Sequence, residues 1–134
     1  MGKLIAALVL LPSAALAQSF TTAAEVRPIL MATRAHWIAV RDYDGQDLLY
    51  FTNLLAWRCG ISHLFYAVNG GDPVELAMQP CHEDTAQPNA LLLDSALPCV
   101  TLAQGSVQTV TVGVVFDDDS VEAASFDRNS VLIP

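Results

Sequence analysis

The stretch TVTVGVVFDDDSVEAASF, residues 109–126, carries the clearest structural signal in the chain. Valine or phenylalanine occupies each even position from 110 to 116, and the odd positions between them include two threonines and a glycine. An apolar side chain at every second residue predicts a half-buried strand. Asp117–Ser120 has the composition of a turn, and Val121–Phe126 is expected to pair back. The stretch therefore predicts a β-hairpin.

Upstream of this hairpin, the sequence predicts four more strands. Trp37–Tyr43 and Leu48–Thr52 flank the turn dipeptide Asp44-Gly45, which favours a hairpin between them. Ile61–Val68 is expected to be a third strand, and Val74–Met78 a short fourth one after the turn Asn69–Pro73. A less favoured alternative makes 48–58 a helix that ends at Gly60.

The two ends of the globular region predict a helix and an edge strand. Thr22-Ala-Ala-Glu25 is a capping-box pattern, so a short N-terminal helix is expected there. Pro28 leaves two alternatives, because either the helix kinks at this residue or Pro28 opens a shorter helix that runs to about Arg34. Val131–Ile133 is expected to add a last short edge strand. Residues 95–116 are interpreted as a loop followed by a strand, and Gln79–Pro98 as a long surface loop.

These elements together predict one mainly β domain over residues 18–134. We expect an antiparallel sheet or small β-sandwich of about six or seven strands, with one N-terminal helix packed on it. The 117 residues that remain when residues 1–17 are removed from the 134-residue chain suit a single hydrophobic core.

Residues 1–17 have the pattern of a secretory signal peptide. Lys3 precedes the apolar run Leu4–Leu11, and Ala15-Leu16-Ala17 supplies the small residues of a cleavage site. The apolar run is too short to span a bilayer as a helix. We expect cleavage after Ala17, a periplasmic or secreted location, and no membrane span in the mature chain.

The charge of the chain excludes some classes of partner. The formal net charge is −8, and Lys3 is the only lysine, so residues 18–134 hold five scattered arginines against fourteen acidic residues. Nucleic acids are bound through clustered basic side chains, so no nucleic-acid partner is expected. The partner is expected to be a protein or a small-molecule ligand. The sequence identifies neither this partner nor the oligomeric state.

Three cysteines allow one intramolecular disulfide in an exported chain. Cys59 and Cys81 are the favoured pair, because their bond would anchor the start of the long loop, and it would stabilise the fold by roughly 3 kcal/mol. Cys99 is then left over, and it is expected to be a small buried hydrophobic residue.

The main alternative for these residues is a zinc or copper site. Cys59, His63, Cys81 and His82 are all possible ligands of such metals. Their spacing matches no known ligand pattern, and adjacent Cys81 and His82 would point apart on an extended chain. An oxidising compartment also favours a disulfide over free thiolates. No cofactor or metal is therefore expected.

Two acidic clusters are weaker candidates for a calcium site. Asp42, Asp44 and Asp47 lie within six residues, but Gly45 stands at the wrong position for an EF-hand loop. A hairpin turn explains Asp44-Gly45 without a metal. Asp117–Asp119 is likewise interpreted as a solvated turn.

The sequence contains no recognisable catalytic motif. It lacks a Gly-x-Ser-x-Gly elbow and a Ser-x-x-Lys motif, and Cys81-His82 is the only adjacent thiol and imidazole. His36 and His63 are interpreted as ordinary strand residues. Arg58 is interpreted either as a structural cation that pairs with a carboxylate or stacks on an aromatic ring, or as a contact for an anion or carboxylate in a groove.

The sequence therefore favours a small exported binding or accessory domain without catalytic activity, stabilised by one disulfide. A domain of this kind is expected to act through a sheet face or through the long loop and to expose an apolar or aromatic patch. The alternatives are a metal-binding protein with Cys/His ligands and a small thiol or serine hydrolase. An enzyme is the less favoured class.

Overall fold

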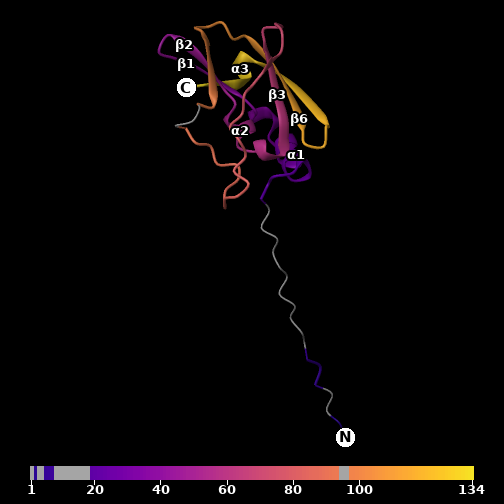
Figure 1. Cartoon of the computed structure of the whole chain (residues 1–134). Helices are drawn as coiled ribbons and strands as arrows, with labels where there is room; N and C mark the ends of the chain where they lie inside the picture. Colours follow the sequence, from indigo (N-terminus) through magenta and orange to yellow (C-terminus); the bar gives the residue numbers. More distant parts are fainter. Residues whose placement is uncertain (1, 3–4, 8–18, 94–96) are drawn as a thin grey trace.

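The computed structural model describes residues 2, 5–7, 19–93 and 97–134. In these residues the chain forms eight strands in two four-stranded sheets, which confirms the expected mainly β fold (Figure 1). The expected signal peptide lies almost entirely outside the described residues, so its cleavage stays a prediction. Among the helices that the structure describes, none has the length and apolar character that a membrane crossing requires.

The first sheet has the strand order β5-β2-β1-β8. Its strands are β1 (Ala39–Tyr43), β2 (Gln46–Tyr50), β5 (Cys99–Ala103) and β8 (Leu132–Ile133). β1 and β2 form the predicted hairpin. Asp44 and Gly45 have φ angles of 52° and 74°, which the two-residue turns of hairpins require. β8 pairs with β1 in parallel, so this sheet is mixed.

The second sheet has the strand order β4-β3-β6-β7 and is antiparallel throughout. Its strands are β3 (Ile61–Val68), β4 (Val74–Glu75), β6 (Thr109–Phe116) and β7 (Val121–Asp127). β3 has the bounds that the sequence predicts, and the hairpin of β6 and β7 is confirmed with its turn at 117–120.

Several strands differ in their bounds from the predicted ones. The described residues contain one strand more than the expected six or seven, because β5 and β6 are separate strands where one was expected. β4 ends at Glu75 instead of Met78, since the chain then turns away from β3. Val131 belongs to the short helix α3 (Arg128–Val131), and only Leu132 and Ile133 form the edge strand.

β1 begins two residues later than predicted because Trp37 is drawn into the core. Its ring is fully buried, and its indole N–H donates to the carbonyl oxygen of Leu30 at 2.8 Å. The preceding residues form the short 3-10 helix η1 (Arg34–His36). The interpretation of His36 as a strand residue was therefore wrong.

The predicted N-terminal helix is α1 (Ala23–Ala32). The Thr22 hydroxyl accepts a hydrogen bond from the backbone N–H of Glu25, and the Glu25 carboxylate accepts one from the N–H of Phe20. Pro28 lies inside the helix, so the shorter helix opened by this residue was the wrong alternative. The helical alternative for 48–58 survives only as α2 (Thr52–Leu55).

The core lies between the two sheets and α1. Its largest fully buried side chains are Trp37, Phe51 and Phe116, and α1 contributes Val26 and Leu30. α1 approaches the 3-10 helix η2 (Arg58–Gly60) closely, because Gly60 has no side chain. A Cβ atom at Gly60 would clash with Val26 and lie 2.7 Å from the Thr22 carbonyl oxygen.

Candidate functional site

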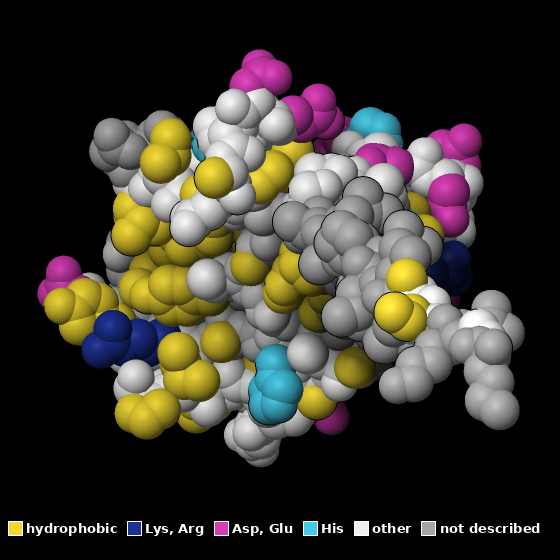
Figure 2. All heavy atoms as spheres, turned by 90° about the horizontal axis from the view of Figure 1, so that it is seen from below, with side chains coloured by type: hydrophobic (Ala, Val, Ile, Leu, Met, Phe, Trp, Pro, Cys, Tyr) yellow, Lys and Arg dark blue, Asp and Glu magenta, His cyan; other side chains and the backbone are white. Residues whose placement is uncertain are grey.

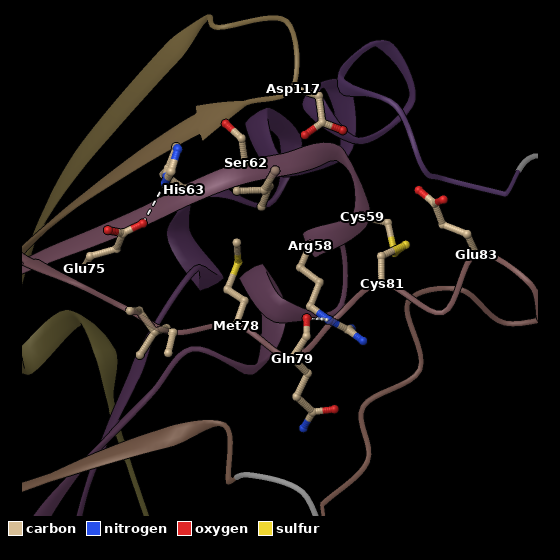
Figure 3. A pocket seen from close by; sticks show the side chains of 13 residues that line it. Arg58, Cys59, Ser62, His63, Glu75, Met78, Gln79, Cys81, Glu83 and Asp117 are labelled. Carbon is tan, nitrogen blue, oxygen red and sulfur yellow. Dashed lines mark hydrogen bonds and ion pairs between the residues drawn. A yellow bond between two sulfur atoms is a disulfide. The ribbon is translucent and has the colours of Figure 1, made fainter.

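A cleft of about 670 Å³ opens at the edge of the second sheet, between the start of β3 and the segment 75–83 (Figure 3). The cleft exists because β4 is so short. The N–H of Leu76 still donates to the carbonyl oxygen of Leu64 at 2.8 Å, after which the chain leaves β3 and runs to Cys81. The side chains at the opening are mostly polar, and they include Ser62, His63, Glu75, Met78, Glu83 and Asp117.

The disulfide between Cys59 and Cys81 forms one wall of this cleft. This is the pairing that the sequence favours, and it joins residues 22 positions apart with their Cα atoms 5.2 Å apart. Cys59 lies in η2, immediately before β3, so the bond fixes the start of the long loop beside the second sheet. The expected anchoring of this loop is therefore confirmed.

Arg58 binds the same loop through backbone carbonyl groups, and not through a carboxylate or an aromatic ring. The residue is 3% exposed, and its guanidinium donates hydrogen bonds to five backbone carbonyl oxygens. Four of these acceptors belong to the loop, and their distances range from 2.7 to 2.9 Å; they are Gln79, Pro80, Asn89 and Ala90. The expected ion pair or ring stack was wrong, because the loop supplies enough carbonyl dipoles to solvate a buried cation.

Asn89 joins the loop to the region before α1. Its side-chain oxygen accepts a hydrogen bond from the N–H of Cys59 at 2.9 Å, and its side-chain NH₂ donates to the carbonyl oxygen of Phe20 at 2.9 Å. The ring of Phe20 also contacts that of Trp57 edge-on, with centroids 5.1 Å apart. These hydrogen bonds therefore attach the loop at Asn89 to η2 and to the region before α1.

Three carboxylates surround the cleft on different sides. Figure 3 shows Glu75 on β4, Glu83 on the long loop and Asp117 just after β6. Burial raises the pKa of Asp117, and the neighbouring charges of Asp118 and Glu83 raise it further. Arg58, the one cation lining the cleft, is engaged by backbone carbonyl groups. The side chains that line the cleft therefore carry more negative than positive formal charge, which favours a cationic ligand.

His63 is oriented by Glu75. The Nδ1 atom of His63 lies 2.6 Å from the Glu75 carboxylate, and both side chains are more than half exposed. Figure 3 shows the second ring nitrogen pointing away from Glu75. His63 does lie on a strand, as expected, but next to a β-bulge at Ser62 that disturbs the pairing of β3 with β6. The Ser62 hydroxyl donates to the carbonyl oxygens of Val115 and Phe116.

The structure brings three of the four candidate metal ligands together. Cys59, His63 and Cys81 line the cleft, whereas His82 is half-buried outside its lining and its Nε2 atom has no hydrogen-bond partner in the described part of the chain. The two sulfur atoms are bonded to each other and are not available as thiolates. Within the described ranges, no group of three or more His, Cys, Asp or Glu side chains is arranged to hold a metal ion.

The acidic residues of the first hairpin separate into different structural roles. Asp44 lies in the turn, and Asp42 accepts a hydrogen bond from Gln104. Asp47 is fully buried, where it accepts hydrogen bonds from the Arg128 guanidinium at 2.6 and 3.1 Å and from the N–H groups of Gly105 and Val107. No local sequence pattern indicates this ion pair, since its partners are 81 residues apart.

The second acidic cluster forms the turn that the sequence predicts. Asp119 has a φ angle of 64°, and the carboxylate of Asp118 accepts a hydrogen bond from the N–H of Ser120. The Asp118 carboxylate therefore stabilises this turn through a local hydrogen bond, as aspartates commonly do in turns.

The outward face of the first sheet carries a group of apolar side chains. It carries Tyr43, Leu48, Tyr50 and Ile133, and a groove of about 440 Å³ beside Tyr50 and Ile133 extends toward His36. Figure 2 shows hydrophobic side chains gathered on the left, the side on which Figure 1 places β1 and β2. An apolar patch of this kind is what a binding domain is expected to expose.

The free thiol of Cys99 lies on the same sheet. Cys99 pairs with Tyr50, and it alternates with Val100, which packs against the core. The side chain is half-buried instead of fully buried as expected, because its position in the strand directs it away from the core. Partial burial raises the pKa of this thiol.

The cleft itself is the feature that sequence reasoning missed. Its wall residues come from β3, β4, the long loop and the turn after β6, and no short motif joins them. The only signal was the odd position of Arg58 in an apolar stretch next to Cys59. The chain matches no protein-family model, no curated protein and no solved structure.

Proposed function

We propose that this chain is a small exported binding domain without catalytic activity, and that its cleft takes a positively charged group of the ligand. The observation that carries the proposal is the cleft of about 670 Å³ with carboxylates on three sides. A cationic group placed there would face Glu75, Glu83 and Asp117, and it would offset the repulsion between Asp117 and Glu83.

The way in which the walls are held supports a binding role. The long loop is fixed to η2 by the Cys59–Cys81 disulfide and by the Arg58 hydrogen bonds, so the cleft exists before the ligand arrives. A preformed site loses less conformational entropy on binding than one that must first be ordered. Export and a periplasmic or secreted location are part of the proposal, and the disulfide is compatible with them.

The proposal is tested with a short Gly/Ser peptide that carries two adjacent arginines followed by alanines, here called the arginine–alanine peptide. We expect saturable binding by titration calorimetry, with an affinity that falls as salt is added. Asp117→Asn is expected to weaken binding by about fivefold to tenfold, since it removes one charge from the cleft. Asp44→Asn removes the same charge from the turn of the first hairpin and is expected to leave binding unchanged.

The pH dependence gives a second test of the same site. The pKa of Asp117 is raised, so its carboxyl group takes up a proton earlier than an ordinary aspartate when the pH falls. Affinity for the arginine–alanine peptide is therefore expected to decrease on acidification, and the Asp117→Asn variant is expected to show a smaller decrease. Binding that is absent up to about millimolar peptide, or unchanged by Asp117→Asn, contradicts the proposal.

A small serine hydrolase is the second candidate, and the hydrogen bond between Glu75 and His63 favours it. A carboxylate that orients a histidine leaves the other ring nitrogen free to act as a general base, and Ser62 is the adjacent hydroxyl. The hydroxyl is engaged by two carbonyl oxygens, however, so the first candidate is preferred. Labelling by a fluorophosphonate probe in the native chain, absent in Ser62→Ala, would establish the hydrolase instead.

A further inference from the structure

A second, smaller hollow lies on the outward face of the second sheet. Phe65, Gly113 and Ala123 stand in one row across β3, β6 and β7, because Phe65 pairs with Gly113 and Gly113 pairs with Ala123. The missing side chain at Gly113 and the small one at Ala123 leave a space of about 160 Å³ beside Phe65, and Pro73 also lines it. The lining is almost entirely apolar.

The hollow and the acidic cleft adjoin each other along β3. His63, which lines the cleft, and Phe65, which lines the hollow, are two residues apart on the same face of the strand. Their rings are stacked, with centroids 6.1 Å apart. Glu75 lines the cleft and pairs with Phe65 across the sheet. The two depressions are therefore neighbouring parts of one surface.

The two depressions suit ligand groups of different chemistry, and the distance between them along β3 is defined. The cleft is acidic, whereas the hollow is apolar and is smaller than the roughly 300–1,000 Å³ of small-molecule sites, so it fits a single side chain. The cleft reaches β3 at residues 61–63 and the hollow at 65–67. Four residues of extended chain span about 13 Å, and side chains four apart point to the same side.

We propose that the cleft and the hollow together bind one extended peptide segment of a partner protein, which carries a basic residue and an aromatic residue four positions later. The inference rests on the proposed function, since the basic residue is the group that enters the acidic cleft. The aromatic ring packs against Phe65 over Gly113, where offset or edge contacts between rings are favourable. Charge complementarity sets the direction of the segment, with its basic residue toward the disulfide and its aromatic residue toward Pro73.

Gly113 provides a clean way to close the hollow. Its φ angle is not positive, and a Cβ atom there would have Phe65 Cβ at 3.9 Å as its nearest neighbour, which is an ordinary contact. Gly113→Val is therefore expected to preserve the fold, since β-branched residues suit a strand interior. Thr101→Val is the matched control, because Thr101 is an exposed residue on β5 in the first sheet.

The experiment compares the arginine–alanine peptide with a variant in which tryptophan stands four positions after the first arginine. The tryptophan peptide is expected to bind the unchanged protein about tenfold more tightly. Gly113→Val is expected to abolish this advantage and to leave the affinity for the arginine–alanine peptide unchanged, whereas Thr101→Val changes neither affinity. Tryptophan three positions after that arginine, on the opposite side of an extended chain, is expected to give no gain.

The outcomes separate the two proposals. If the arginine–alanine peptide does not bind, the proposed function is wrong and this inference fails with it. If that peptide binds but tryptophan adds nothing, or if its advantage survives in Gly113→Val, only the peptide groove is wrong. A tryptophan advantage that is equal at both spacings also overturns the groove, because it indicates nonspecific stacking.

Discussion

Two arginines hold the fold at the level of single residues, the buried Arg58 and the partly buried Arg128, and they use different acceptors. Arg58 is surrounded by backbone carbonyl oxygens, whereas Arg128 pairs with the Asp47 carboxylate. Asp47 ties β2 to α3 and to the N–H groups of Gly105 and Val107. A buried ion pair that loses one partner leaves an uncompensated charge, which is why such losses are costly.

Asp47→Asn is therefore expected to lower the free energy of unfolding by about 3 kcal/mol at neutral pH. An asparagine cannot neutralise Arg128, so the guanidinium would remain charged in a largely buried site. Urea denaturation followed by circular dichroism measures the change. Asp42→Asn is the control, because Asp42 is exposed and is expected to change the stability by less than about 0.5 kcal/mol. Equal effects of the two substitutions would contradict the assigned role of Asp47.

The pH dependence of stability follows from the same residue. Hydrogen bonding to Arg128 and to two backbone N–H groups holds the pKa of Asp47 well below its usual range. The unfolded chain has a pKa of about 3.9 at this residue, so the unfolded state takes up the proton first on acidification. The stability contributed by Asp47 is present above about pH 5 and is lost as the pH falls toward the native pKa. Asp47→Asn is expected to flatten this decrease below pH 5.

At the level of elements, the packing of α1 on η2 depends on one glycine. Gly60 allows the backbone of η2 to approach the start of α1, where Val26 and the Thr22 carbonyl group lie. η2 also carries Arg58 and Cys59, which fasten the long loop. This contact therefore positions the wall of the cleft as well as the helix.

Gly60→Ala is expected to destabilise the protein by about 1–3 kcal/mol, because the added methyl group overlaps atoms that cannot all move away. Thermal unfolding monitored by circular dichroism measures the loss as a lower midpoint. Gly113→Ala is the matched control, since the same methyl group meets only an ordinary contact there and suits a strand. A Gly60→Ala variant as stable as Gly113→Ala would show that α1 does not approach η2 so closely.

At the level of the whole molecule, the long loop is attached to the sandwich by both covalent and noncovalent contacts. Two adjacent residues of η2, Arg58 and Cys59, make most of them. The disulfide holds Cys81, and the Arg58 and Asn89 side chains hold the next part of the loop. Residues 76–93 contain neither helix nor strand, so these contacts take the place of regular hydrogen bonding. The disulfide stabilises the fold by restricting the unfolded chain. The hydrogen bonds of Arg58 and Asn89 stabilise it by satisfying buried polar groups, so the two contributions are separate.

Replacement of both bonded cysteines, Cys59→Ser with Cys81→Ser, is expected to lower the free energy of unfolding by about 3 kcal/mol while the sandwich remains folded. Cys99→Ser is the control and is expected to have little effect, since Cys99 is unpaired. The protein without substitutions is denatured and alkylated, and its intact mass is measured. We expect one modified cysteine before reduction and three after it. Three modified cysteines before reduction would mean that the disulfide is absent in solution.

The strands were predictable where their signal is local. β3 and the hairpin of β6 and β7 follow from an alternating pattern, and the first hairpin follows from Asp44-Gly45. The failures occurred where a distant contact overrides the local pattern. Trp37 leaves the predicted strand because its ring fills the core against α1. β4 ends at Glu75, although the N–H of Leu76 still donates to the carbonyl oxygen of Leu64 on β3.

The sequence by itself determined the mainly β character, the hairpin turns and the helix cap at Thr22. These features depend on side-chain periodicity and on backbone conformations that few residues tolerate. The sequence favoured Cys59 and Cys81 among the three possible cysteine pairs, and the structure decided this pairing. Only the tertiary structure decided the cleft, the hollow at Gly113, the carbonyl acceptors of Arg58 and the Asp47–Arg128 pair. Each of these features joins residues that lie far apart in the chain. Burial of the shared core brings these residues together, and no local sequence pattern indicates which ones will meet.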